Sequence, residues 1–413
     1  MMRRNNFHLA FALAGAIQFA GLASNAAAKG SAVSACPQTI TTCGCTITKP
    51  GNYTITTNLT GTASQDCIDI SAAKVNLRSD AFALTGAGGN SVGINVLKSA
   101  ANVNLQLADP TNPDNISVIT GFDVGIEIQA SGAIVTGFDV SQNQSNGLLI
   151  KGSSCSVMGF TSNSNSLGNG VTISGSSGCQ ISNFTASGNS GLGVALVNAK
   201  TTTVESFDAS DLGGLGGNAG GGIGLTSSSS NTIANFGADY NVGAGVTLTN
   251  SSKNQLFNFE ANGSVSGSGI VLSDSSSNSI FDFYALDDNF YGVWLNGSSS
   301  NSVRFAVTQG NTQAGVYLGC AANGVGGSCK SGAKTSTKNT VTAIIAGNDT
   351  NSPIPIAEAY GIAADLGDLQ NSLGGLTATG DSSADLDDRN SNCGTNGWFA
   401  NYGPFGSPAC TTP

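Results

Sequence analysis

Few side chains in this sequence can perform acid–base or metal chemistry, and carboxylates are most of them. The chain has 25 acidic residues, 15 basic residues and one histidine, His8. Asp282, Asp287 and Asp288 lie close together in sequence, and hydrolysis of a glycosidic bond requires two carboxyl groups facing one groove. These three fall on different faces of the expected strands, and no partner for them is evident one repeat away. We therefore assign no catalytic residue.

The first 28 residues have the features of a secretory signal peptide. Arg3 and Arg4 give a positive start, residues 9–22 are mostly apolar, and residues 26–28 form a small-residue cleavage site. No later stretch has the roughly 18 uninterrupted apolar residues of a membrane helix. We expect a secreted or periplasmic protein without a membrane span.

Removal of residues 1–28 changes the chemistry available to the chain. This segment holds His8, two of the 15 basic residues and none of the 25 acidic ones, so the formal charge falls from −10 to −12. Without histidine, Ser-His-Asp and Cys-His catalysis and His-ligated zinc or copper are excluded, and we expect no metal and no cofactor. The negative charge argues against nucleic-acid binding.

All ten cysteines follow residue 28, and an even number in an exported chain favours disulfides. Four of them, Cys36, Cys43, Cys45 and Cys67, crowd the start of the mature chain, and their pairing stays open. Cys320 and Cys329 flank a glycine-rich loop, and Cys393 and Cys410 bracket the tail. A redox role for Cys43-Gly-Cys45 is the alternative, but its spacing is not that of a thioredoxin motif.

A repeat runs through most of the chain. Its first element is glycine, an aliphatic residue, a variable residue and another aliphatic residue. The glycines of this element are Gly93, Gly125, Gly147, Gly170, Gly193, Gly222, Gly245, Gly269, Gly292 and Gly315. Their spacing is 22 to 24 residues except for two longer intervals of 32 and 29. A fixed period of this size is typical of a solenoid.

A second element follows each first one, as in Asn231–Phe236, and ends in an aromatic residue from Phe138 to Phe283. Both elements alternate apolar and polar residues over four to six positions, which predicts strands separated by Gly-, Ser- and Asn-rich turns. No segment has a sustained helical stripe. We predict an all-β, single-stranded right-handed parallel β-helix of about a dozen coils of 22–24 residues.

This solenoid predicts three internal arrangements. The Phe row should stack at the strand spacing of about 4.8 Å, and the Asn positions should form a hydrogen-bonded ladder at a sharp turn. Cys155 and Cys179 are 24 residues apart at the same repeat position. They should be neighbours, either as a disulfide or as stacked thiols.

The repeats resemble the right-handed parallel β-helix repeats of the pectin-lyase-like superfamily from about residue 86 to 375. The segments around Cys45–Tyr53 and Asp388–Gly394 resemble the Cys-containing ends of exported bacterial β-helix proteins. The resemblance implies a disulfide-rich cap with first coils at 29–85, a β-helix at 86–375 with an insertion at 319–338, and a capping tail at 376–413. The family includes polysaccharide lyases, hydrolases and epimerases, but of the hydrolase motifs only Asp287-Asp288 has a counterpart here.

The variable residue of the first element should point to solvent. Trp294 and Tyr317 are 23 residues apart in this row, so we expect them to stack on adjacent coils as an exposed pair that suits a sugar ring. Tyr291 and Arg304 are the other glycan-binding candidates. The alternative is that the insertion at 319–338 or the C-terminal tail covers the pair.

Two further surfaces stand out. The insertion carries a small basic group, namely Lys330, Lys334 and Lys338. Phe257 and Phe281 form an outward apolar patch that could be a lateral interface between molecules.

Together these features predict an exported β-helix protein with a glycan-contact or surface-structural role and no evident catalytic site. Its expected partner is a polysaccharide or cell-surface glycan, and lateral self-association is possible. The alternative is a divergent polysaccharide lyase or glycoside hydrolase.

Overall fold

The computed structural model describes residues 34–79, 81–107, 116–211, 216–320, 325, 327, 333–347 and 358–402. The chain divides into two units, Met1–Ala32 and Val33–Pro413, and all described residues lie in the second. The expected signal peptide at 1–28 therefore lies outside the described residues.

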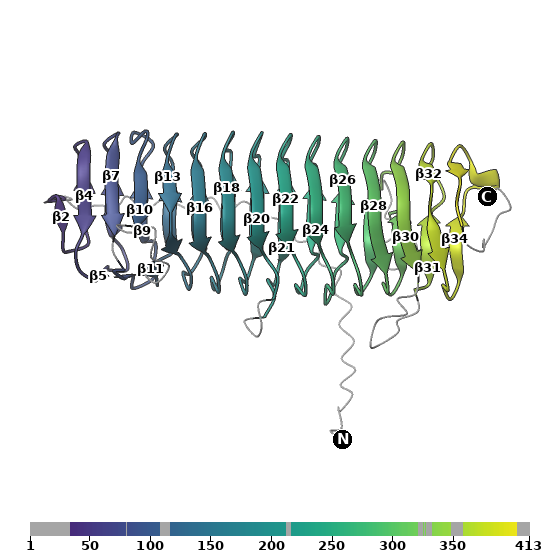
Figure 1. Ribbon diagram of the computed structural model, residues 1–413, viewed down its shortest axis with the longest axis horizontal. Helices are drawn as coiled ribbons and strands as arrows, with labels where there is room; N and C mark the ends of the chain where they lie inside the picture. The colour runs from purple at the N-terminus through teal and green to yellow at the C-terminus, as the bar shows by residue number, and fades with distance from the viewer. Residues whose placement is uncertain are drawn as a thin grey trace, which may run out of the picture. The chain divides into compact units, whose positions relative to one another are not determined.

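The described strands form coils that stack in parallel along one axis (Figure 1). One sheet has 15 strands, each paired with its equivalent in the next coil. They are β1 (Ser34–Ala35), β3 (Cys45–Ile47), β6 (Ile68–Ile70), β9 (Val92–Val96), β12 (Val124–Ile128), β15 (Asn146–Ile150), β17 (Val171–Ser174), β19 (Leu192–Val197), β21 (Gly221–Thr226), β23 (Val246–Thr249), β25 (Ile270–Ser273), β27 (Tyr291–Asn296), β29 (Ala314–Leu318), β31 (Tyr360–Ala364) and β34 (Ala384–Asp388). We call this the first sheet.

The second sheet has 20 strands. They are β2 (Thr39–Ile40), β4 (Gly51–Ile55), β5 (Leu59–Thr60), β7 (Val75–Ser79), β8 (Leu84–Thr85), β10 (Asn104–Leu107), β11 (Ser117–Thr120), β13 (Ile134–Thr136), β14 (Phe138–Asp139), β16 (Ser156–Thr161), β18 (Gln180–Thr185), β20 (Thr203–Asp208), β22 (Thr232–Gly237), β24 (Gln255–Glu260), β26 (Ser279–Tyr284), β28 (Ser302–Gln309), β30 (Thr340–Gly347), β32 (Ser372–Gly374), β33 (Thr377–Thr379) and β35 (Gly397–Phe399). One 3-10 turn covers Ser391–Cys393. The predicted all-β solenoid of parallel coils is confirmed.

The stack extends further at both ends than the repeat alone indicates. The first sheet has 15 strands where about a dozen coils were expected, because β1, β3 and β6 near the N-terminus and β34 near the C-terminus join it. These terminal strands lack the Gly-aliphatic signature. Pairing through the backbone needs no particular side chain, so segments of irregular sequence can still extend a stack. Stacked strands therefore continue past residue 375.

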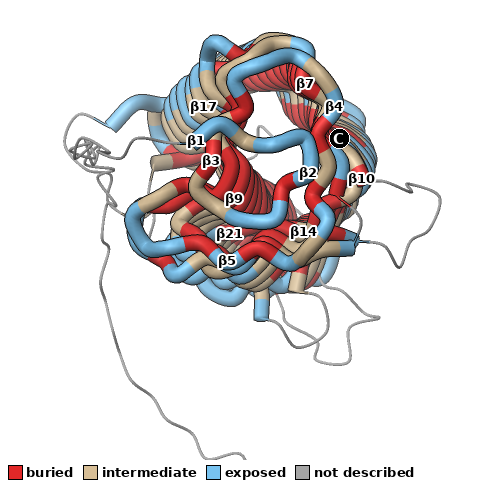
Figure 2. Tube along the Cα trace, turned by 90° about the vertical axis from the view of Figure 1, so that its left-hand side faces the viewer, coloured by how far each residue is buried: buried red, intermediate tan, exposed pale blue. Residues whose placement is uncertain are grey.

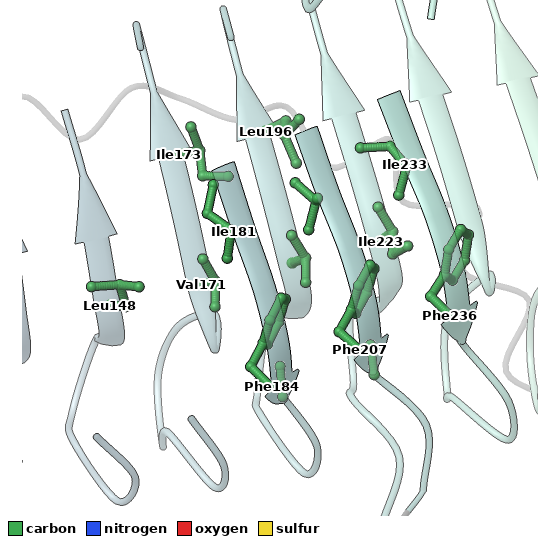
Figure 3. Close-up of a cluster of buried hydrophobic side chains, with 14 of the residues drawn as sticks. Leu148, Val171, Ile173, Ile181, Phe184, Leu196, Phe207, Ile223, Ile233 and Phe236 are labelled. Carbon is green, nitrogen blue, oxygen red and sulfur yellow. The ribbon is translucent and has the colours of Figure 1, made fainter. Parts of the chain in front are cut away.

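The interior is a continuous core of Val, Ile, Leu and Phe. Figure 2, which looks along the stack, shows the buried positions lining the inside and the exposed ones on the outside. In Figure 3, Phe184, Phe207 and Phe236 follow one another on adjacent strands. Ring centroids in the row from Phe160 to Phe283 are 4.5 to 5.1 Å apart. The predicted aromatic stack is confirmed for this part of the row.

The predicted asparagine ladder lies at the turn before the second-sheet strands. Each side chain amide donates to the amide oxygen one coil on, over distances of 3.0 to 3.2 Å. The members are Asn231, Asn254, Asn278, Asn301, Asn339, Asn371 and Asn396. A buried backbone N–H in this turn has no strand partner of its own, so the ladder supplies the acceptor.

A second asparagine ladder lines the turn that leads to the first sheet. In this row the backbone N–H of each asparagine but the last donates to the side-chain oxygen of the asparagine one coil on. The members are Asn143, Asn165, Asn189, Asn218 and Asn241. Farther along, Asp288 and then Glu358 occupy the equivalent place beside Asn311. We did not predict this ladder from the sequence, in which Ser264, Asp288 and Glu358 interrupt the row of asparagines.

Asp288 has a carboxyl group at a ladder position where Asn311 and most other members have an amide. Its Oδ1 accepts from Ser264 N over 2.8 Å, while Oδ2 is buried without a described partner. In Asn311, the atom in that place is Nδ2, which donates to the carbonyl of Ala285. A carboxyl oxygen can donate in the same way only if it is protonated. Burial raises the pKa of Asp288 well above its usual range.

Disulfides join neighbouring coils. Cys36 pairs with Cys45, Cys43 with Cys67, and Cys155 with Cys179 at a Cα separation of 4.5 Å. The last pair is a disulfide and not a pair of stacked thiols.

The remaining cysteines lie at the insertion and the tail. Cys320 and Cys393 are also disulfide-bonded, and Cys329 and Cys410, their predicted partners, lie outside the described residues.

We predict that Asp288→Asn stabilises the protein at neutral pH. Because the folded pKa of Asp288 lies above the unfolded value, its contribution is fully present at acidic pH and is lost as the pH rises from about 4. In denaturant unfolding, the free energy of unfolding of the variant should rise relative to that of the wild type by up to about 1.4 kcal/mol for each pH unit above about 4. An equal difference at all pH values would contradict a protonated Asp288.

Candidate functional site

Three of the four predicted glycan-binding residues lie together, but two of them are buried. Trp294 pairs with Tyr317 across adjacent first-sheet strands, as expected. The ring of Tyr317 stacks on that of Tyr291 at 4.7 Å, and these two tyrosines are 0% and 1% exposed. The expectation of an exposed aromatic pair is therefore wrong.

The insertion covers this aromatic cluster, as the alternative held. Trp294 Nε1 donates to the carbonyl of Gly319 at 2.7 Å, and Val325 packs against the cluster. The hydroxyl of Tyr317 donates to Asp365 in the next coil. Exposure of large apolar side chains to water costs free energy, so their coverage by other parts of the chain stabilises the folded state. The cluster is a small second core.

Arg304, the fourth candidate, does not belong to this cluster. It lies on β28 in the second sheet, with its guanidinium carbon 5.2 Å from the ring centre of Phe281. The basic group expected on the insertion is also divided. Lys334 is paired with Asp274 at 2.8 Å, and Lys330 lies outside the described residues.

The exposed aromatic side chains lie instead on the outer face of the second sheet. The rings of Phe257 and Phe281 stack at 5.1 Å and are half-buried. Arg304 follows in the next coil and lies between the rings of Phe281 and Phe305. Phe305 is 57% exposed. We call Phe257, Phe281, Arg304 and Phe305 the aromatic row.

Phe305 occupies a backbone position that disfavours it. In successive coils from β13 to β33, one residue directly before the interior aromatic or its equivalent has a left-handed conformation. This row comprises Gly137, Gly159, Asn183, Ser206, Asn235, Asn258, Asp282, Phe305, Ala343 and Gly375. Small and amide side chains tolerate this conformation, whereas Phe305 at φ 55° is both strained and exposed.

A groove of about 470 Å³ lies beside the aromatic row. Its lining is Phe207, Asp208, Ser210, Asn235, Phe236, Gly237, Asp239, Asn258, Phe259, Glu260, Asp282 and Tyr284. These residues come from four successive coils, β20, β22, β24 and β26, and the turns that follow them. We call this the acidic groove.

The register of the strands builds the groove. Asp208, Gly237, Glu260 and Tyr284 are consecutive members of one outward row. Gly237 places no side chain between the two acids, and a Cβ there would lie only 2.9 Å from Ser210 Oγ. The open position, flanked by longer side chains, makes a depression in the sheet face.

The carboxylates of the groove influence one another. Partial burial, followed by the negative charges of Glu260 and Asp208, raises the pKa of Asp239 to about 6. Asp239 Oδ1 accepts from Asn262 N at 2.8 Å, which opposes this rise. Asp239 can therefore hold a proton at mildly acidic pH.

The three acids noted first in the sequence are separated by the fold. Asp282 lines the acidic groove, whereas Asp288 belongs to an internal ladder and is 0% exposed. The Asp287-Asp288 pair therefore does not present two carboxylates to one groove. No three His, Cys, Asp or Glu of the described residues converge to hold a metal ion. No helix in that part of the chain is long and apolar enough to cross a membrane.

Comparison with known proteins agrees with this architecture. The family described as the right-handed beta helix region matches residues 124–283. The chain is a right-handed parallel β-helix protein. No curated protein matches it by sequence.

Solved structures share the β-helix fold at low identity. The Dettilon tailspike protein (gp208) is 15% identical, with a TM-score of 0.51 over 76% of this chain and 61% of the tailspike. The periplasmic alginate epimerase AlgG is 14% identical, with a TM-score of 0.40 over 84% of this chain and 76% of AlgG.

The Azotobacter vinelandii mannuronan C-5 epimerase AlgE4 A-module is 13% identical, with a TM-score of 0.39 over 90% of this chain and 91% of that module. This chain covers 61% of the length of the tailspike. The similarity to the tailspike shows the fold alone.

We predict that Glu260→Gln lowers the pKa of Asp239, because it removes a neighbouring negative charge that raises it. NMR titration of the Asp carboxyl carbons measures this shift. Asp274→Asn, which alters an acid already paired with Lys334, should leave the titration of Asp239 unchanged. A titration unaffected by Glu260→Gln would show that the two carboxylates do not interact.

Proposed function

We propose that this β-helix protein contacts a polysaccharide through the aromatic row and the acidic groove. Phe305 is the observation that carries the proposal. A bulky side chain in the left-handed conformation, exposed to solvent, contributes nothing to the core and strains the backbone. Such an outlier is expected where a ligand uses the side chain.

The chemistry of this face suits sugars. Aromatic rings pack against the apolar face of a sugar ring, and carboxylates and amides bond to its hydroxyl groups. Phe257, Phe281 and Phe305 supply the first kind of contact, and Asp282 and Asn258 lie beside them for the second. Because the aromatic row and the acidic groove both run along the axis of stacking, this face suits an extended polymer.

An exported protein would meet such a polymer. The disulfides Cys36–Cys45, Cys43–Cys67 and Cys155–Cys179 are typical of an oxidising compartment. Together with the signal-peptide features of residues 1–28, they support a secreted or periplasmic location. The surface-structural role, with lateral association through Phe257 and Phe281, is the competing proposal.

We predict that Phe305→Asn separates binding from stability. Asparagine tolerates the left-handed conformation, so the variant should be more stable by about 1 kcal/mol in denaturant unfolding. Loss of the ring should weaken polysaccharide binding about tenfold, measured by affinity electrophoresis against a panel of neutral, acidic and amino polysaccharides.

Leu167→Ala is the matched control, since it removes another large exposed side chain several coils away. It should leave binding unchanged. Binding retained in Phe305→Asn would overturn the role of this face. Concentration-dependent sedimentation of the wild type, lost in Phe281→Ser, would favour lateral association instead.

Hydrolysis of the bound polysaccharide is a second candidate function, favoured by the raised pKa of Asp239. A glycoside hydrolase pairs a protonated carboxyl group, which donates to the leaving oxygen, with an ionised carboxylate. Asp239 has the raised pKa that the first role needs, and Glu260 supplies a second carboxyl group in the same acidic groove.

We predict that, if hydrolysis occurs, Asp239→Asn abolishes the release of new reducing ends while binding persists. Activity should fall as the pH rises above about 6, where Asp239 loses its proton. If no polysaccharide that binds releases new reducing ends, hydrolysis is contradicted and the glycan contact is the function that stands.

A further inference from the structure

The acidic groove carries negative charge that the described chain does not balance. Asp208, Asp239, Glu260 and Asp282 line it, and its lining includes neither Lys nor Arg. The ion pairs among the described residues involve other acids. Arg304, in the coil after Asp282, lies against two Phe rings instead.

The four acids are distributed along the stack. Asp208 comes from β20, Glu260 from β24 and Asp282 from β26, while Asp239 follows β22. No three of the described acids converge as a metal site would require. A ligand with positive charges spaced along a chain matches this distribution better than a single ion does.

The aromatic row narrows the chemistry of such a ligand. Its rings lie beside a carboxylate on the outer face, since the left-handed Asp282 interrupts the strand alternation and leaves both Phe281 and Asp282 outside the core. Rings of this kind pack against the apolar faces of sugars. A polymer that offers sugar faces and ammonium groups together is a polysaccharide of hexosamine residues whose amino groups are not acetylated.

We infer that the acidic groove selects a cationic, amino-sugar polysaccharide. This inference rests on the proposed glycan contact and adds the charge of the ligand. An acidic polysaccharide would meet four carboxylates, so repulsion disfavours it. A neutral polysaccharide would gain hydrogen bonds from the groove but no ionic attraction.

The test compares glucosamine oligomers, N-acetylglucosamine oligomers of equal length and oligogalacturonate by calorimetry, at a pH just above 6, at which Asp239 has lost its proton and the amines are still partly protonated. We expect the glucosamine oligomer to bind the full mature chain at least about tenfold more tightly than the acetylated one. The preference should shrink as salt is added, because screening weakens attraction between exposed charges.

Two variants place the effect in the groove. The double variant Asp239→Asn, Glu260→Gln should lose the preference for the glucosamine oligomer over the acetylated one. Asp274→Asn, which removes an acid outside the groove, should keep the preference. Thermal unfolding confirms that each variant is folded.

The outcomes separate the two proposals. Equal binding of the glucosamine and acetylated oligomers would overturn the inference and leave the glycan contact intact. Absence of binding to all three oligomers would overturn both. Tighter binding of oligolysine than of a glucosamine oligomer of equal charge would show that the groove recognises charge without sugar, which also overturns the inference.

Discussion

Every coil of this protein depends on parallel pairing with its neighbours in a fixed register. A strand of four to six residues buries one face and leaves its backbone unpaired unless equivalent strands lie on both sides. The interior shows how strictly the register is kept, with Phe rings 4.5 to 5.1 Å apart from Phe160 to Phe283. Asparagine ladders maintain the same register at the turns.

The register that orders the interior also orders the surface. Outward positions fall into rows along the stack, so residues 23 or 24 positions apart become neighbours. The acidic groove arises because Asp208, Gly237 and Glu260 are consecutive members of one such row. Phe305 departs from the Gly, Asn, Ser, Asp and Ala residues of its row, and the proposed glycan contact rests on this departure.

Acids inside the ladders link the same architecture to pH. Asp368 accepts a hydrogen bond from Ser336 N in the turn before β30. Burial raises the pKa of Asp368 to about 7. Burial raises the pKa of Asp288 and Glu358 in the second asparagine ladder. Each of these groups favours the folded state most when it is protonated, so stability from them decreases as the pH rises.

Period and residue type were enough to predict the solenoid, its aromatic stack and the ladder from Asn231 onward, because these depend on local alternation repeated at one spacing. Where the stack ends, which aromatic residues are covered, and which acids meet were decided only in three dimensions. Val325 of the insertion packs against the cluster that buries Tyr317. Asp208 and Glu260 line one groove because successive coils bring distant residues into one row. Such contacts depend on where the chain returns in space, which the pattern of a single repeat does not contain.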